Sequence, residues 1–118
     1  MSGHWYARPV LSVRNASRSL EFYASKLGFK ENWRHEEEGR PRIVQVSRQG
    51  CELTLSDQWP EEAGRGLMFI SLHASDFKLT RQDWAERGVD VKSGWWGYDL
   101  LVVEDPDGNR LWFPHPNA

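Results

Sequence analysis

Glu104-Asp-Pro-Asp-Gly-Asn109 is the stretch of this chain that decides its fold. Asp105, Pro106 and Gly108 occupy the first, second and fourth positions of a turn, where a type I turn favours these residues. Apolar strand patterns flank the turn, Tyr98-Asp-Leu-Leu-Val-Val-Glu104 before it and Arg110-Leu-Trp-Phe-Pro114 after it. The sequence therefore predicts a β-hairpin over residues 98–114.

The hairpin completes a group of elements in the second half of the chain. The expected elements are a strand over 67–72, a helix over 77–87, and strands over 89–91, 99–103 and 109–113. Ser75 or Asp76 is the expected N-cap of the helix, and Gly88 is the residue expected to end it. Phe77 and Trp84 lie two turns apart on one helix face, which predicts that both belong to the core.

The first half of the chain repeats this order. Its expected elements are a strand over 9–13, a helix over 16–27, and strands over 29–35, 42–47 and 51–56, with turns at 36–41 and 48–50. Asn15 is the expected N-cap and Gly28 the C-terminal stop. The repeat predicts one α+β domain over 1–118, with module 1 at about 7–56, a linker at 57–66 and module 2 at about 67–114.

Composition limits the classes of function. A chain of 118 residues forms one compact domain. A net charge of −2 offers no basic surface for nucleic acid and no polybasic segment for a membrane. No apolar run approaches the roughly 18 residues that cross a bilayer. The single cysteine, Cys51, suits a reducing compartment, so we expect a cytoplasmic protein.

Three separate motifs resemble one family in their order and spacing. They are Pro9-Val-Leu-Ser-Val-Arg-Asn15 continuing to Leu27-Gly-Phe29, then Ala85-Glu-Arg-Gly-Val89, then Glu104-Asp-Pro-Asp-Gly-Asn109. Together they resemble the glyoxalase/bleomycin-resistance/extradiol-dioxygenase superfamily, also called vicinal oxygen chelate, over nearly the whole chain. The resemblance implies two βαβββ modules whose mixed sheet curls around a cleft, in a homodimer with two pockets near the subunit interface. That superfamily includes isomerases, dioxygenases, thiol transferases and non-enzymatic drug-binding proteins, so the site must decide the function.

The metal-binding positions of the superfamily's enzymes are mostly occupied here by residues that cannot bind a metal. Carried over through the resemblance, these positions fall near Arg8, on Glu52 or Thr54, near Leu67 to Phe69, and on Trp112. A catalytic divalent ion needs about three oxygen or nitrogen ligands from the protein. The four histidines, interpreted as surface residues, lie away from the matched positions: His4, His35, His73 and His115. We therefore expect no metal, no cofactor and no catalytic residue.

Two further features have ordinary structural explanations. Cys51 opens a strand with no basic neighbour in sequence, which favours a buried, inert thiol over a nucleophile. Glu36-Glu37-Glu38 is typical of a solvated hairpin tip. The alternative for this acidic run is a negative lip that steers a cationic ligand.

Aromatic residues are the compositional oddity, with seven Trp, five Phe and three Tyr. Trp96-Gly97 resembles an aromatic-glycine pair that precedes the last hairpin in bleomycin-resistance proteins. An indole beside a glycine can lie flat against a planar ligand. Strand alternation sends Trp95 and Trp96 to opposite sides, and we select Trp96 as the pocket residue. The alternative, in which both rings seal the sheet or a dimer interface, stays open.

Other aromatic and polar residues are assigned by their place in the pattern. Trp33, His35 and Thr54 are expected in a cleft wall, with Val44 and Val46 as further candidates that depend on strand register. Trp5 is expected to be a packed N-terminal anchor, and Trp112 either a core plug or a pocket floor. The predicted ligand-binding set is Trp33, His35, Thr54, Trp59, Trp96, Gly97, Tyr98 and Trp112.

The sequence thus predicts a metal-independent protein that sequesters a small, planar aromatic, antibiotic-like compound, of which bleomycin is one candidate. A rival hypothesis is a divergent metal-dependent lyase, isomerase or dioxygenase that uses Glu52 and further ligands displaced by a register slip. A third is an interaction module that takes no small ligand.

Overall fold

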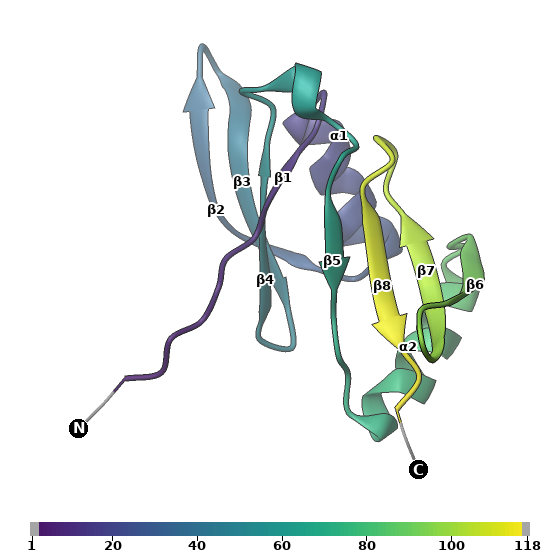
Figure 1. Ribbon diagram of the computed structural model, residues 1–118. Helices are drawn as coiled ribbons and strands as arrows, with labels where there is room; N and C mark the ends of the chain where they lie inside the picture. Colours follow the sequence, from purple (N-terminus) through teal and green to yellow (C-terminus); the bar gives the residue numbers. More distant parts are fainter. Residues whose placement is uncertain (1–2, 117–118) are drawn as a thin grey trace.

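Two four-stranded mixed sheets lie next to each other in the computed structural model, which describes residues 3–116 (Figure 1). The first sheet contains β1 (Val10–Ser12), β2 (Lys30–Glu37), β3 (Arg40–Arg48) and β4 (Cys51–Ser56). Its strand order is β1-β4-β3-β2, with β1 parallel to β4 and the other pairs antiparallel. The helical segment of this module is α1 (Ala16–Glu21), followed directly by the π-helical turn η1 (Phe22–Lys26).

The second sheet repeats the first. It contains β5 (Leu67–Phe69), β6 (Val91–Trp95), β7 (Asp99–Glu104) and β8 (Arg110–Pro114), with α2 (Ala74–Glu86) between β5 and β6. Its order is β5-β8-β7-β6, again with one parallel pair, β5 and β8. A short 3₁₀ turn, η2 (Pro60–Glu62), interrupts the linker. The predicted α+β fold of two βαβββ modules with mixed sheets is therefore confirmed.

The start of the first helix also follows the prediction. The Asn15 side chain accepts a hydrogen bond from the Arg18 backbone N–H at 3.0 Å, as an N-cap does. Gly28 ends the helical segment with a φ of +78°, a conformation that glycine adopts without steric cost. Helical spacing places Ala16, Leu20, Tyr23 and Leu27 on one face; Leu20 is partly buried and the other three are fully buried.

Several details of the sequence prediction are wrong. The second helix is capped by His73, not by Ser75 or Asp76, because the Phe77 N–H already bonds to the His73 carbonyl at 2.9 Å. The strand expected at 89–91 begins only at Val91 and runs to Trp95, because the Val89 N–H closes the helix end on the Trp84 carbonyl. The turn expected over 36–41 is shorter, since β2 and β3 reach Glu37 and Arg40.

The hydrophobic core lies on the helix side of both sheets and continues from one module to the other. Trp84 is 2% exposed and packs edge to face on Phe113 at 5.0 Å between ring centroids, so its predicted core position is confirmed. Trp5, by contrast, is fully exposed at 101% and packs on nothing, so its assignment as a packed anchor is wrong. No helix within residues 3–116 has the length and apolar character needed to cross a membrane.

The turn between β7 and β8 fastens module 2 to the helix of module 1. The Tyr23 hydroxyl donates to the Asp105 carboxylate at 2.9 Å. Asp107 accepts from the Arg14 backbone N–H at 3.1 Å and from the Ser19 hydroxyl at 3.3 Å. Burial, and then the charge of Asp105, raise the pKa of the Tyr23 hydroxyl well above its ordinary value of 10. The turn that marks the fold in the sequence is thus also a joint between the modules.

Candidate functional site

Four aromatic side chains meet on the face of the second sheet that no helix covers. This aromatic cluster consists of Phe69 on β5, Trp112 on β8, and Trp96 and Tyr98 from the β6–β7 turn. The parallel register pairs Phe69 with Trp112. The Trp96 ring centroid lies 5.6 Å from that of Phe69, 5.6 Å from that of Trp112 and 6.3 Å from that of Tyr98. These separations are those of interacting aromatic pairs.

The β6–β7 turn holds its two aromatic residues over the sheet. The Trp96 N–H donates to the Tyr98 carbonyl at 3.0 Å, which closes the turn around Gly97. Gly97 has a φ of +75°, and a Cβ placed there would meet no atom within 4 Å. Trp95 pairs with Asp99 and is 74% exposed, outside the aromatic cluster. The two neighbouring tryptophans therefore take different roles, and Trp96 is the one over the open face.

The aromatic cluster is accessible from solvent. Trp96 remains 57% exposed, and Phe69 and Tyr98 are also exposed, while Trp112 beneath them is half-buried. Leu111 and Phe113, its neighbours on β8, point into the core. Trp112 is therefore the floor of an open aromatic surface and does not plug the core. An exposed apolar patch of this kind is typical of a ligand-binding or interaction surface.

A groove of about 520 Å³ adjoins the aromatic cluster between the two modules. Phe69 lines both the groove and the cluster, and the extended segment Tyr6 to Pro9 forms the opposite side. The Glu52 carboxylate also faces the groove and lies 3.5 Å from Arg8 Nε in an ion pair. The groove thus offers one acidic group, already paired, beside the aromatic surface.

The open face of the first sheet is more polar. Trp33 and Thr54, together with Arg8 and Gln45, line a hollow of about 360 Å³. His35 follows Trp33 on β2, and its Nε2 lies 3.2 Å from a Glu37 carboxylate oxygen.

Val44 and Val46 do not belong to this face. They are fully buried under the helix, because the β2–β3 register pairs Gln45 with Trp33 on the open face and sends the valines to the other side. Their inclusion in the cleft wall is wrong.

The predicted site residues therefore separate into groups. Trp96, Tyr98 and Trp112 come together around Gly97, whereas Trp33, His35 and Thr54 lie on the other sheet. Trp59, at the start of η2 in the linker, is half-exposed and lines neither the groove beside the aromatic cluster nor the hollow at Trp33. Phe69 is not among the ligand-binding residues that the sequence predicts, since the resemblance places it only near a metal-binding position. Its parallel pairing with Trp112 is the signal that would have identified it.

Metal-binding side chains do not gather within residues 3–116, where no group of three His, Cys, Asp or Glu residues is close enough to share an ion. Of the positions carried over from the superfamily's enzymes, Glu52 pairs with Arg8 and Phe69 pairs with Trp112. Cys51 is half-buried, less deeply than expected, and burial followed by the charge of Glu52 raises the pKa of its thiol. A raised pKa leaves little of the nucleophilic thiolate at neutral pH.

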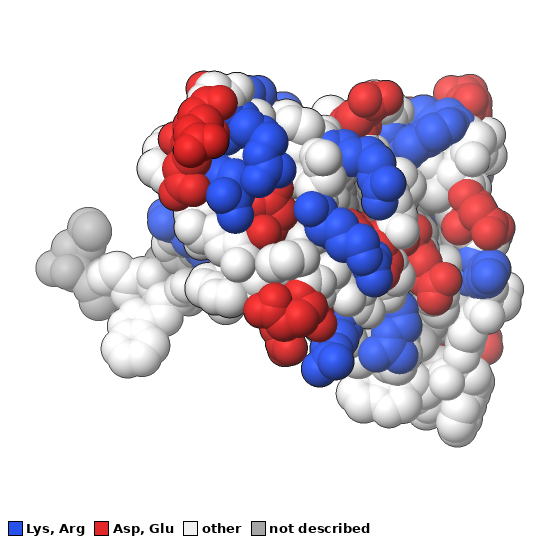
Figure 2. All heavy atoms as spheres, turned by 90° about the horizontal axis from the view of Figure 1, so that it is seen from above, with Lys and Arg blue, Asp and Glu red and all other residues white. Residues whose placement is uncertain are grey.

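Charged side chains are evenly mixed on the end of the molecule that carries the β2–β3 and β7–β8 turns. Figure 2 shows basic and acidic side chains interspersed there, without a broad area of one sign. Glu37 and Glu38, together with Arg40 and Arg42, line a small hollow on the β2–β3 hairpin. The acidic run at this hairpin tip is therefore partly balanced by arginines.

Solved structures share this fold over almost the whole chain. TnmS3, an antibiotic-binding protein from Streptomyces sp. CB03234, is 20% identical with a TM-score of 0.75, covering 99% of this chain and 100% of that one. The bleomycin-binding protein of Streptomyces verticillus, solved with copper(II)-bleomycin, is 21% identical with a TM-score of 0.74 and the same coverage. A glyoxalase/bleomycin resistance protein from Catenulispora acidiphila DSM 44928 is 22% identical with a TM-score of 0.73, covering 92% and 95%. No curated protein matches the sequence.

These low identities show only a shared fold, so membership of a family rests on the match to a family model. The model described as Glyoxalase/Bleomycin resistance protein/Dioxygenase superfamily matches residues 5–113. This span includes both modules and the linker. The chain belongs to the glyoxalase/bleomycin resistance protein/dioxygenase superfamily.

Proposed function

We propose that this protein is a metal-independent binding protein of the bleomycin-resistance type, which sequesters a small planar aromatic compound without bond chemistry. The observation that carries the proposal is the exposed aromatic cluster of Phe69, Trp96, Tyr98 and Trp112. A flat ligand finds rings here on which it can stack. Two of the solved proteins that share the fold bind antibiotics, because TnmS3 is an antibiotic-binding protein and the Streptomyces verticillus protein is bound to copper(II)-bleomycin.

The binding free energy available from such a surface is sufficient to hold a small planar ligand. Stacked or edge-to-face aromatic pairs add about 0.5–1.5 kcal/mol each beyond the burial of their area. Burial of ring area contributes about 25 cal/mol per Å². Two or three ring contacts with burial therefore support an affinity on the order of micromolar, which corresponds to about −8 kcal/mol.

We further propose a homodimer. In one chain the open faces of both sheets are uncovered, with Trp33 exposed on the first and Trp96 on the second. A second copy would cover these faces and enclose the ligand from two sides, so that Trp33, His35, Thr54 and Trp59 would join the pocket wall. A single half-buried cysteine fits the reducing conditions of the cytoplasm, which is the proposed location.

The rival function is a divergent metal-dependent lyase, isomerase or dioxygenase of the same superfamily. Membership of the superfamily and the placement of Glu52 in a groove favour it. It requires at least two further ligands to converge on Glu52, which is paired with Arg8.

A fluorescence titration distinguishes these functions. Metal-free bleomycin and other flat antibiotics are titrated against the tryptophan emission of protein treated with a chelator. Saturation at one or two ligands per dimer supports sequestration. Metal analysis of untreated protein is the companion measurement, and about one tightly bound divalent ion per chain contradicts the proposal. If the tryptophan emission changes with none of the compounds, the protein is instead an interaction module that takes no small ligand.

A further inference from the structure

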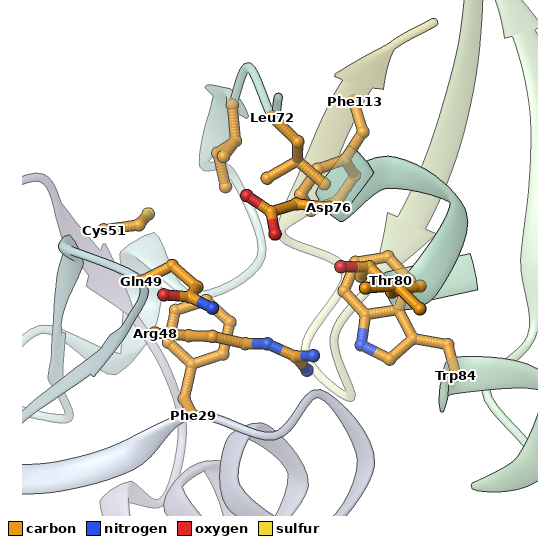
Figure 3. A pocket seen from close by; sticks show the side chains of 11 residues that line it. Phe29, Arg48, Gln49, Cys51, Leu72, Asp76, Thr80, Trp84 and Phe113 are labelled. Carbon is orange, nitrogen blue, oxygen red and sulfur yellow. The ribbon is translucent and has the colours of Figure 1, made fainter. Parts of the chain in front are cut away.

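A second pocket lies at the junction of the modules, on the side of the sheets that carries the helices (Figure 3). Its volume is about 190 Å³. Phe29 enters it from module 1, and Ile70, Trp84 and Phe113 enter it from module 2. Each of these four side chains is less than 9% exposed, so the walls are fixed by the core. The pocket is therefore a preformed apolar cavity with an opening to solvent.

Two polar groups of α2 point into this cavity. Figure 3 shows the Asp76 carboxylate and the Thr80 hydroxyl directed toward its interior. They lie four residues apart, one turn along the same helix face. Thr80 is only 8% exposed. Every fully buried side-chain polar atom within residues 3–116 has a hydrogen-bond partner. The Thr80 hydroxyl makes no hydrogen bond with the described residues 3–116. Its oxygen is therefore not fully buried and remains accessible from the cavity.

One cation and one anion line the cavity, Arg48 and Asp76. The Arg48 Nη1 pairs with the Asp83 carboxylate at 3.0 Å and also donates to the Leu27 carbonyl. Arg87 shares the Asp83 carboxylate, with its Nε at 2.8 Å. Asp76 makes no ion pair with any residue of the described range 3–116. It also sits in the first turn of α2, where the helix dipole favours a negative carboxylate. An entering ligand therefore meets one carboxylate that has no cation partner, beside an arginine that is already paired with a carboxylate.

We propose that this pocket binds a small primary amine that carries a single aromatic ring. An apolar cavity of about 150 Å³ accepts a benzene molecule, so this slightly larger one accepts a ring with a short arm. The ring packs among Phe29, Trp84 and Phe113. The ammonium donates to the Asp76 carboxylate and to the Thr80 oxygen, which satisfies both unpartnered groups.

This pocket is separate from the aromatic cluster. Trp112 and Phe113 follow one another on β8 and point to opposite faces of the sheet, Trp112 to the cluster and Phe113 to the pocket. A variant of the cluster can therefore test whether an amine binds in one place or the other.

The test compares three probes that share a phenyl ring and a two-carbon arm, on the unaltered protein, by isothermal titration calorimetry. The probes are 2-phenylethylamine, the neutral 2-phenylethanol and the anionic 3-phenylpropanoate. We expect the amine to bind at least about tenfold more tightly than the carboxylate, because charge-assisted hydrogen bonds are the strong ones. Equal or tighter binding of 3-phenylpropanoate overturns the proposal without the need for any variant.

Two variants locate the amine. Asp76→Asn should weaken 2-phenylethylamine about tenfold and leave 2-phenylethanol within about twofold, because only the charge is removed. Thr80→Val, which keeps the shape of the side chain, should weaken the amine by about threefold. Asp90→Asn, the same change at an exposed carboxylate outside both sites, is the matched control and should leave the dissociation constant of 2-phenylethylamine within about twofold. Trp96→Ala, in the aromatic cluster, should also leave the dissociation constant of this amine within about twofold. Loss of amine binding in Trp96→Ala with full binding in Asp76→Asn would contradict the proposed site.

Discussion

The two modules share an order of elements but differ in the side chains at one equivalent position of their parallel ladders. The third pair of the parallel ladder is Ser12 with Ser56 in module 1 and Phe69 with Trp112 in module 2. The same backbone position therefore holds two small hydroxyls in one sheet and two aromatic rings in the other. The repeat accounts for the fold, and the residues that break the repeat account for the proposed site.

The buried carboxylates divide in a similar way. Asp57, at the start of the linker, binds module 1, because it accepts from the Ala16 N–H at 3.0 Å and pairs with Arg40 and Arg42. Asp105, in contrast, reaches from module 2 to Tyr23 of module 1. Module 2 thus supplies both the aromatic surface and the joint that holds the modules together.

Asp105→Ala is the strongest way to break this joint. The carboxylate accepts from the Tyr23 hydroxyl, from the Asn109 side chain and from two backbone N–H groups, each at 2.9 Å. Its loss leaves buried donors unsatisfied at about 1–3 kcal/mol each, so we expect the free energy of unfolding to fall by about 3–5 kcal/mol. Urea denaturation measures this. The exposed Asp90→Ala should stay within about 0.5 kcal/mol of the unaltered protein, and a similar small loss for Asp105→Ala would contradict the account.

A pair of glycines tests the same joint at the backbone. Gly64 in the linker has a φ of +83°, and a Cβ there would collide with the Asp107 carbonyl oxygen. Gly97 has a similar φ of +75° but faces open space. Gly64→Ala should therefore cost about 2–4 kcal/mol and Gly97→Ala only about 1 kcal/mol, the cost of the conformation alone. Equal midpoints of thermal unfolding for the two variants would contradict the close contact between Gly64 and the Asp107 carbonyl.

Tyr23→Phe gives a smaller effect that depends on pH. Burial and then Asp105 raise the pKa of this hydroxyl above 10 in the native state. Above about pH 10 the unfolded chain releases the proton while the native state keeps it, so this contribution to stability is full below pH 10 and is lost as the pH rises. The phenylalanine variant should lose about 1 kcal/mol at pH 7 and decline less steeply at alkaline pH. Midpoints of urea denaturation between pH 7 and 11 measure both effects. If the midpoints of the variant and of the unaltered protein fall in parallel as the pH rises, the hydroxyl does not have a raised pKa.

Much of the fold could be predicted because its signals are local. The turn at Asp105 to Gly108 and the caps at Asn15 and Gly28 each depend on a few adjacent residues. These are the features that the structure reproduces.

The remainder depends on pairing between distant segments. Phe69 enters the aromatic cluster only through its parallel register with Trp112, and Val44 leaves the open face through the register of β2 with β3. A shift of one residue exchanges the two faces of a strand, so composition alone does not fix them. The pocket on the helix side of the sheets is lined by both Phe29 of module 1 and Phe113 of module 2, a combination that no local pattern predicts.

The central claim is that the aromatic face of module 2 binds the planar ligand. Its most direct test is the ratio of the dissociation constants of metal-free bleomycin for Trp96→Ala and Trp95→Ala. These neighbouring tryptophans are both exposed, but only Trp96 contacts Phe69 and Trp112. We predict binding at least about tenfold weaker for Trp96→Ala and unchanged within about twofold for Trp95→Ala. Equal dissociation constants for the two variants would contradict the claim.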